Sequence, residues 1–90
     1  MIFIKTTASA GTFESNDCLV TIKKAETLSI EIESVVFDQF GDQIHDVVLK
    51  TLKTLNVKNI HVYIKDKGAL DYTLAARIKT ACKRLGVYHD

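Results

Sequence analysis

The segment Leu28–Leu55 reads LSIEIESVVFDQFGDQIHDVVLKTLKTL, and the spacing of its apolar residues changes at Ser34. Before Ser34, apolar and polar residues alternate, which is the period of a half-buried strand. After it, apolar residues recur at steps of three and four, as on one face of a helix. The expected helical stripe consists of Val36, Phe37, Phe40, Ile44, Val47, Val48, Leu52 and Leu55. A strand that passes into an amphipathic helix predicts a sheet covered by helices.

The ends and the interior of this helix carry further signals. Ser34 is expected to cap its start, because serine is a preferred N-cap residue. Asn56 suits the left-handed position that often follows a helix. Gly41, inside the helix, costs about 1 kcal/mol relative to alanine, so we expect either a bend or a close packing contact there.

Two strands are expected upstream of Leu28. In the nearer one, Cys18, Val20 and Ile22 point to one side, and the short segment Lys24–Thr27 predicts a hairpin that joins it to the strand after Leu28. The segment Ile2–Thr7 is rich in β-branched and aromatic residues, which predicts a first short strand.

The small residues Ala8–Gly11 are expected to end this first strand. Downstream of the long helix, the segment Ile60–Lys65 again alternates and predicts one more strand. Asp66-Lys67-Gly68 is expected to turn the chain, and a second helix, capped by Asp71, should run to a stop at Gly86.

The expected fold class is α+β, in the order β-β-β-α-β-α. It is a two-layer sandwich in which a small antiparallel or mixed sheet packs against two helices. Ninety residues allow one domain with a single core, so we expect one domain over residues 1–90 and no second domain.

Composition excludes several classes of partner. The 12 basic and 11 acidic residues give a net charge of +1, which provides no strong field for nucleic acid or an anionic membrane. No apolar run approaches the ~20 residues of a membrane span, so we expect a cytoplasmic protein.

Cys18 and Cys82 are expected to be buried, reduced thiols. Phe13, Tyr63 and Tyr72 lack the basic surroundings of base-stacking residues, which favours packing roles for them.

The sequence shows no catalytic or metal-binding pattern. His45 stands beside Asp46, an arrangement that can serve a general base, but it lies one step off the apolar stripe and is expected on the surface. His61 and His89 share no element with His45, so we expect no metal site. Four dispersed glycines form no phosphate loop.

Two polar loops remain as candidate sites. Ala10-Gly11-Thr12-Phe13-Glu14-Ser15-Asn16-Asp17 has one hydroxyl between two carboxylates, and Asp66-Lys67-Gly68-Ala69-Leu70-Asp71 lies far downstream. Alone, the first is an ordinary turn whose side chains bond their own backbone. Together with Phe37-Asp38-Gln39-Phe40-Gly41, however, the two loops resemble three motifs of the citrate lyase acyl carrier protein (gamma subunit) family. These motifs are Ala-Gly-Thr-Leu-Glu-Ser-Ser/Gly-Asp, Glu-Lys-Gln-Phe-Gly and Asp-Lys-Gly-Ala-Leu-Asp, and the resemblance spans residues 8–85.

The resemblance implies that Ser15 carries a covalent prosthetic group, 2'-(5''-phosphoribosyl)-3'-dephospho-CoA, through a phosphodiester. A prosthetic-group transferase would attach it, and its thiol would hold acetyl and citryl groups as thioesters. The alpha subunit of citrate lyase would exchange acetyl for citrate, and the beta subunit would split the citryl thioester. The chain itself would be a single acyl carrier domain over residues 1–90, and not an enzyme. The charges of Glu14 and Asp17 are expected to direct the arm into solvent.

Other interpretations stay open at this point. The first alternative is a small α+β interaction or binding module without a covalent group, and the next is an enzyme that uses His45 and Asp46. Citramalyl groups could replace citryl groups. The chain also departs from the family pattern at three positions. Phe13 replaces Leu, Asn16 replaces Ser or Gly, and Tyr72 stands where the family has Cys.

Overall fold

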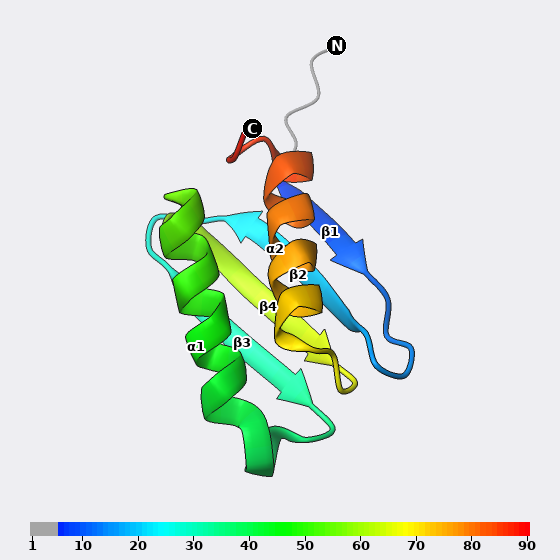
Figure 1. The fold of residues 1–90 in the computed structure, drawn as a ribbon. Helices are drawn as coiled ribbons and strands as arrows, with labels where there is room; N and C mark the ends of the chain where they lie inside the picture. The colour runs from blue at the N-terminus through cyan, green and yellow to red at the C-terminus, as the bar shows by residue number, and fades with distance from the viewer. Residues whose placement is uncertain (1–5) are drawn as a thin grey trace.

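A computed structural model describes residues 6–90 (Figure 1). Its elements are β1 (Thr7–Gly11), β2 (Cys18–Lys24), β3 (Ser29–Ser34), α1 (Phe37–Leu55), β4 (Ile60–Asp66) and α2 (Asp71–Leu85). The order β-β-β-α-β-α confirms the predicted α+β fold. The first strand was predicted over Ile2–Thr7, and residues 2–5 of it lie outside the residues that the structure describes.

The four strands form one mixed sheet in the order β1-β2-β4-β3. Strand β2 is antiparallel to β1 and β4, whereas β3 is parallel to β4. The predicted hairpin between β2 and β3 is therefore wrong, because β4 lies between them. Parallel neighbours need a crossover connection, and α1 supplies it between β3 and β4.

Both helices cover the same face of the sheet (Figure 1), with α2 against β1 and β2 and α1 against β3. The predicted inward faces are confirmed, because Cys18, Val20 and Ile22 of β2 are fully buried. The expectation that residues 8–11 end the first strand is wrong, since they belong to β1. Ala8 and Ala10 of β1 are buried in the core, and small side chains let α2 pack close to this strand.

Helix α1 begins later than the sequence suggests. Its N-cap is Val36, with no side-chain capping bond, so the prediction that Ser34 caps the helix is wrong. Ser34 is the last residue of β3, and its Oγ accepts the N–H of Val36 at 3.1 Å and donates to Asp66 at 2.8 Å. At the other end, Asn56 is left-handed (φ 57°), as predicted.

The apolar stripe of α1 is only partly buried. Ile44, Val48 and Leu52 belong to the core, but Phe37 is 50% and Phe40 is 43% exposed. Gly41 explains part of this arrangement, because a Cβ added there would lie 2.9 Å from the Phe37 ring. Of the two expectations for Gly41, the close packing contact is therefore confirmed.

Candidate functional site

The turn that contains Ser15 joins β1 to β2 at one end of the sheet (Figure 1). Ser15 is exposed, and its hydroxyl makes no hydrogen bond with any residue from Thr6 to Asp90. A modifying enzyme can therefore reach this oxygen without breaking a contact within the described chain.

The residues beside Ser15 are held firmly. Asp17 N–H donates to Glu14 O at 3.1 Å, which closes a β-turn with Ser15 and Asn16 at its centre. Asn16 N–H donates to Lys67 O at 2.8 Å, and Lys67 N–H donates to Asp17 O at 2.9 Å. Asn16 has a φ of 64°, a conformation that asparagine and glycine tolerate, so asparagine is compatible with this turn.

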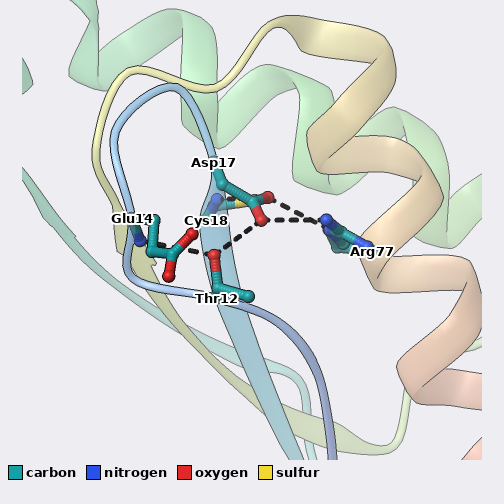
Figure 2. A network of polar contacts seen from close by, with 5 residues as sticks. All are labelled: Thr12, Glu14, Asp17, Cys18 and Arg77. Carbon is teal, nitrogen blue, oxygen red and sulfur yellow. Dashed lines mark hydrogen bonds and ion pairs between the residues drawn. The ribbon is translucent and has the colours of Figure 1, made fainter.

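Asp17 faces helix α2 and not the tip of the turn. Figure 2 shows its carboxylate among Thr12, Cys18 and Arg77. Arg77 donates to it through Nε at 3.1 Å and Nη2 at 2.8 Å, and Thr12 Oγ1 donates at 2.8 Å. The Cys18 N–H donates at 2.7 Å. The Arg77 guanidinium lowers the pKa of Asp17 to about 2.

This network corrects the expectation that two free carboxylates flank Ser15. Asp17 is neutralised by a bidentate ion pair with Arg77, so of the two flanking carboxylates only that of Glu14 has no ion-pair partner among the described residues. Arg77 is a residue that the sequence interpretation missed. It lies 60 positions from Asp17, and no periodic pattern links the two.

The second loop supports the first through a buried carboxylate. Asp66 is 2% exposed and accepts hydrogen bonds from Ser34 Oγ at 2.8 Å, Gly68 N–H at 3.2 Å and Ala69 N–H at 3.0 Å. These bonds confirm the predicted turn at residues 66–68. They also fix the Lys67 backbone that binds the Ser15 turn.

Asp71 does not cap the second helix, contrary to the prediction. The N-cap of α2 is Leu70, which lacks a side-chain capping bond, and Asp71 is the first helical residue. Its carboxylate accepts both bonds from Gln43 Nε2, at 3.0 and 3.1 Å. Asp71 therefore joins the starts of α1 and α2. The predicted stop at Gly86 is confirmed, with a left-handed φ of 84°.

The remaining candidate residues do not form a second site. His45 is exposed, as predicted, and its neighbour Asp46 pairs with Lys50 at 2.9 Å. No group of histidine, cysteine and acidic residues in the described part of the chain could hold a metal ion. Cys18 and Cys82 are buried free thiols, as predicted. Among residues 6–90, no helix has the length and apolarity to cross a membrane.

Phe13 contacts two lysines and takes no part in the Asp17 network. Its ring centroid is 5.6 Å from Lys65 Nζ and 5.3 Å from Lys67 Nζ, so it makes two cation–π contacts. Phe13 is nevertheless 43% exposed and has two lysine neighbours, so the expectation of a packing role without basic surroundings is wrong for it. The packing role expected for Tyr72 is also wrong, because Tyr72 is 73% exposed.

Fold and site together define a small α+β domain that presents a serine on a rigid turn. Comparisons with known proteins identify relatives of this domain. Residues 5–85 match the family model of the malonate decarboxylase delta subunit (MdcD), an acyl carrier family. The citrate lyase acyl carrier protein of Halothermothrix orenii is 44% identical over 82 residues, which cover 90% of this chain and 87% of the relative. That of Treponema denticola is 47% identical over 81 residues, with 90% and 93% covered.

The chain belongs to the citrate lyase acyl carrier protein family, and it is an acyl carrier and not a catalytic subunit. A solved relative has the same fold. One chain in the crystal structure of a Pseudomonas malonate decarboxylase hetero-tetramer in complex with malonate superimposes with a TM-score of 0.79 at 18% identity, covering 92% of this chain and 87% of that one.

Proposed function

We propose that this chain is the acyl carrier subunit of citrate lyase and that Ser15 is the attachment point of its prosthetic group. The observation that carries the assignment is the contrast within the turn. Asn16 and Asp17 are bonded to the second loop or to α2, whereas the Ser15 hydroxyl is exposed and unbonded among the described residues. The names of the relatives support citrate as the source of the acyl group.

The residues present are compatible with 2'-(5''-phosphoribosyl)-3'-dephospho-CoA on Ser15. A phosphodiester adds negative charge, which a nearby free carboxylate would oppose. Arg77 compensates Asp17, and that carboxylate is directed toward α2 (Figure 2). Glu14 is exposed to solvent, where its repulsion is screened.

When attached, the group supplies a terminal thiol that holds acetyl and citryl or citramalyl groups as thioesters. The chain's own residues supply position and no acid, base or nucleophile. The β-turn directs Ser15 outward, and the bonds to Lys67 and Arg77 fix the turn to β4 and α2. Tethering raises the concentration of the thioester at the alpha transferase and beta lyase subunits, which would perform the chemistry.

Intact mass spectrometry tests this assignment. The chain is produced with the prosthetic-group transferase and its supporting enzymes, and Ser15→Ala is compared with Ser9→Ala, which alters an exposed serine of β1. We expect one added group on the parent chain and on Ser9→Ala and none on Ser15→Ala. Citrate cleavage by the reconstituted complex should be lost with Ser15→Ala alone. An active complex whose Ser15 carries nothing would refute the proposal.

A further inference from the structure

Two lysine side chains lie beside one aromatic ring at the turn that carries Ser15. The ring is that of Phe13, two residues before Ser15, and its centroid is 5.6 Å from Lys65 Nζ and 5.3 Å from Lys67 Nζ. Phe13 is 43% exposed, and both lysines are half-buried. These three side chains form the Phe13 cluster. It links the β1–β2 turn to the end of β4, and Figure 1 shows both segments at the same end of the molecule.

Backbone hydrogen bonds hold the cluster next to Ser15. Asn16 N–H donates to Lys67 O at 2.8 Å, and Lys67 N–H donates to Asp17 O at 2.9 Å. The two residues that follow Ser15 are therefore paired with the residue that provides one of the ammonium groups. A lysine side chain is long and flexible, so this ammonium group can follow an anion attached at the turn.

Neither lysine of the cluster has an anionic partner within the described chain. Lys65 and Lys67 occur in no ion pair there, and their side chains make no hydrogen bond. Glu33 is opposite Lys65 in the sheet, but its carboxylate accepts the Tyr63 hydroxyl at 2.9 Å. Asp17 is opposite Lys67, but its carboxylate is bound to α2. The acidic residues paired with these lysines are thus engaged elsewhere.

This combination of charge and aromatic surface suits a nucleotide. Two ammonium groups near one ring repel each other, and a phosphate between them would turn this repulsion into attraction. A cation–π contact offsets only about 0.5–1 kcal/mol at an exposed site. Lysines that bind phosphates, next to an aromatic ring that contacts a base, are the usual means by which proteins hold nucleotides without reading a sequence.

We infer that the Phe13 cluster binds the nucleotide part of the arm attached to Ser15, with Lys65 and Lys67 at its phosphates and the Phe13 ring against its adenine. The inference rests on the proposed function, because it needs the arm at Ser15. On the same turn, only Glu14 has a carboxylate without an ion-pair partner, so one negative charge opposes two positive ones. The arm would then lie against the domain at its base, and the sequence-based expectation that charge directs it into solvent would not hold.

Attachment makes weak contacts sufficient. A group tethered two residues from Phe13 has a high effective concentration at the cluster, so exposed ion pairs and one stacking contact can hold it reversibly. The part of the arm beyond its phosphates would remain free to move. A shorter free segment confines the thiol to a smaller volume, which raises its effective concentration at a nearby active site.

NMR spectroscopy of the protein that carries the arm tests this inference. The chain is produced with the prosthetic-group transferase, and intact mass spectrometry confirms that each sample is loaded. The parent is compared with the double variant Lys65→Gln/Lys67→Gln and with Phe13→Leu, which keeps an apolar side chain. Lys24→Gln is the matched control, because it changes an exposed lysine at the other end of β2. Circular dichroism checks that each variant is folded.

In the parent, we expect nuclear Overhauser effects between adenine protons and the Phe13 ring. These should be lost in the double variant and retained in Lys24→Gln. A nucleotide pyrophosphatase should cleave the diphosphate of the arm about tenfold faster in the double variant than in the parent, and Phe13→Leu should fall between them. Absence of the adenine–Phe13 effects in the parent would overturn the inference, as would equal cleavage rates in all variants. The spectrum of the parent decides even where a variant accepts the arm poorly.

A second measurement separates the attached arm from a free nucleotide. Dephospho-CoA added to arm-free Ser15→Ala should bind only weakly, with a Kd of about 1 mM or more, because the tether is absent. A Kd below about 10 µM would identify a free nucleotide as the ligand and would overturn the inference. An arm found on Ser15 without contacts to the Phe13 cluster leaves the proposed function intact, whereas an absent arm refutes the proposed function itself.

Discussion

Ser15 has a rigid surrounding but a free side chain, and both properties suit a covalent attachment point. The backbone bonds of Asn16 and Asp17 fix the backbone that carries the Ser15 side chain. No contact with the described chain must break before that hydroxyl is modified. Since Asp17 does not face the hydroxyl, modification should leave the ion pair with Arg77, and hence the turn, unchanged (Figure 2).

The ion pair of Asp17 predicts an acid-dependent loss of stability. Arg77 holds the pKa of Asp17 at about 2, below its usual 3.8. Because the pKa is lower in the folded state, the stabilisation is present above about pH 4 and is lost as the pH falls toward about 2. Asp17→Asn should lower the free energy of unfolding by about 1 kcal/mol near pH 7, after allowance for solvent around the pair, and by much less near pH 2.

Urea unfolding between these pH values measures this difference. Asp46→Asn is the control, because it breaks an exposed helical pair with Lys50 whose contribution is small at every pH. If Asp17→Asn destabilised the protein equally across the whole pH range, the ion pair would not be the cause.

At the level of helices and strands, sequence patterns predicted which side chains are buried better than they predicted which strands pair. The alternation in β2 and β4 identified their buried side chains correctly, since a period of two directly records which side faces the core. It does not record which strand lies alongside. The order β3-α1-β4 was the available signal, because a helix between two strands allows parallel pairing.

In the candidate site, too, the sequence predicted local features and missed contacts between distant residues. The exposure of Ser15 followed from the polar composition of its turn, which is a local property. The ion pair with Arg77 joins residues 60 positions apart, and tertiary packing alone brings them together. The exposed faces of Phe37 and Phe40 were also missed, because a helical period cannot show where the covering sheet ends.

The connection between β4 and α2 should depend on the Asp66 carboxylate. Asp66→Asn replaces one acceptor oxygen by an amide that meets N–H or O–H donors, so we expect a loss of about 1–3 kcal/mol in the free energy of unfolding. Ser34→Ala removes one of three donors and should cost less. Urea unfolding of both variants checks the order, and a larger loss for Ser34→Ala would contradict this account.

Gly41→Ala should test how firmly the Phe37 ring is held against α1. Alanine favours the helix by about 1 kcal/mol, but its Cβ would lie within 2.9–3.0 Å of the outer atoms of the Phe37 ring. This ring is half exposed and can turn away, so we expect an unchanged or slightly higher melting temperature and a shifted Phe37 signal in NMR spectra. A large fall in melting temperature would show that the ring is held in place.

Across the whole molecule, the two ends differ in the segments and charged side chains that they carry. One end carries the Ser15 turn, whereas the C-terminal segment lies at the other, where Lys79 and Lys83 pair with Asp90 (Figure 1). The helices thus begin acidic near Ser15 and end basic away from it. Lys65 and Lys67 lie beside Phe13 at the Ser15 end, so this division of charge holds for the helices and not for the whole surface.

The distribution of thiols predicts that the arm provides the reactive sulfur of the folded protein. Cys18 and Cys82 are both 0% exposed. Burial raises the pKa of Cys18 to about 12 and that of Cys82 to about 11, so almost no thiolate is present near neutral pH.

A disulfide reagent should therefore react rapidly with one thiol in the protein that carries the arm and with none in folded Ser15→Ala. Denaturant should expose two further thiols in each protein, in agreement with the two cysteines of the sequence. A rapid reaction in folded Ser15→Ala would show that a cysteine is accessible, and then the core could not keep its own sulfur from competing for acyl groups with the thiol on the arm.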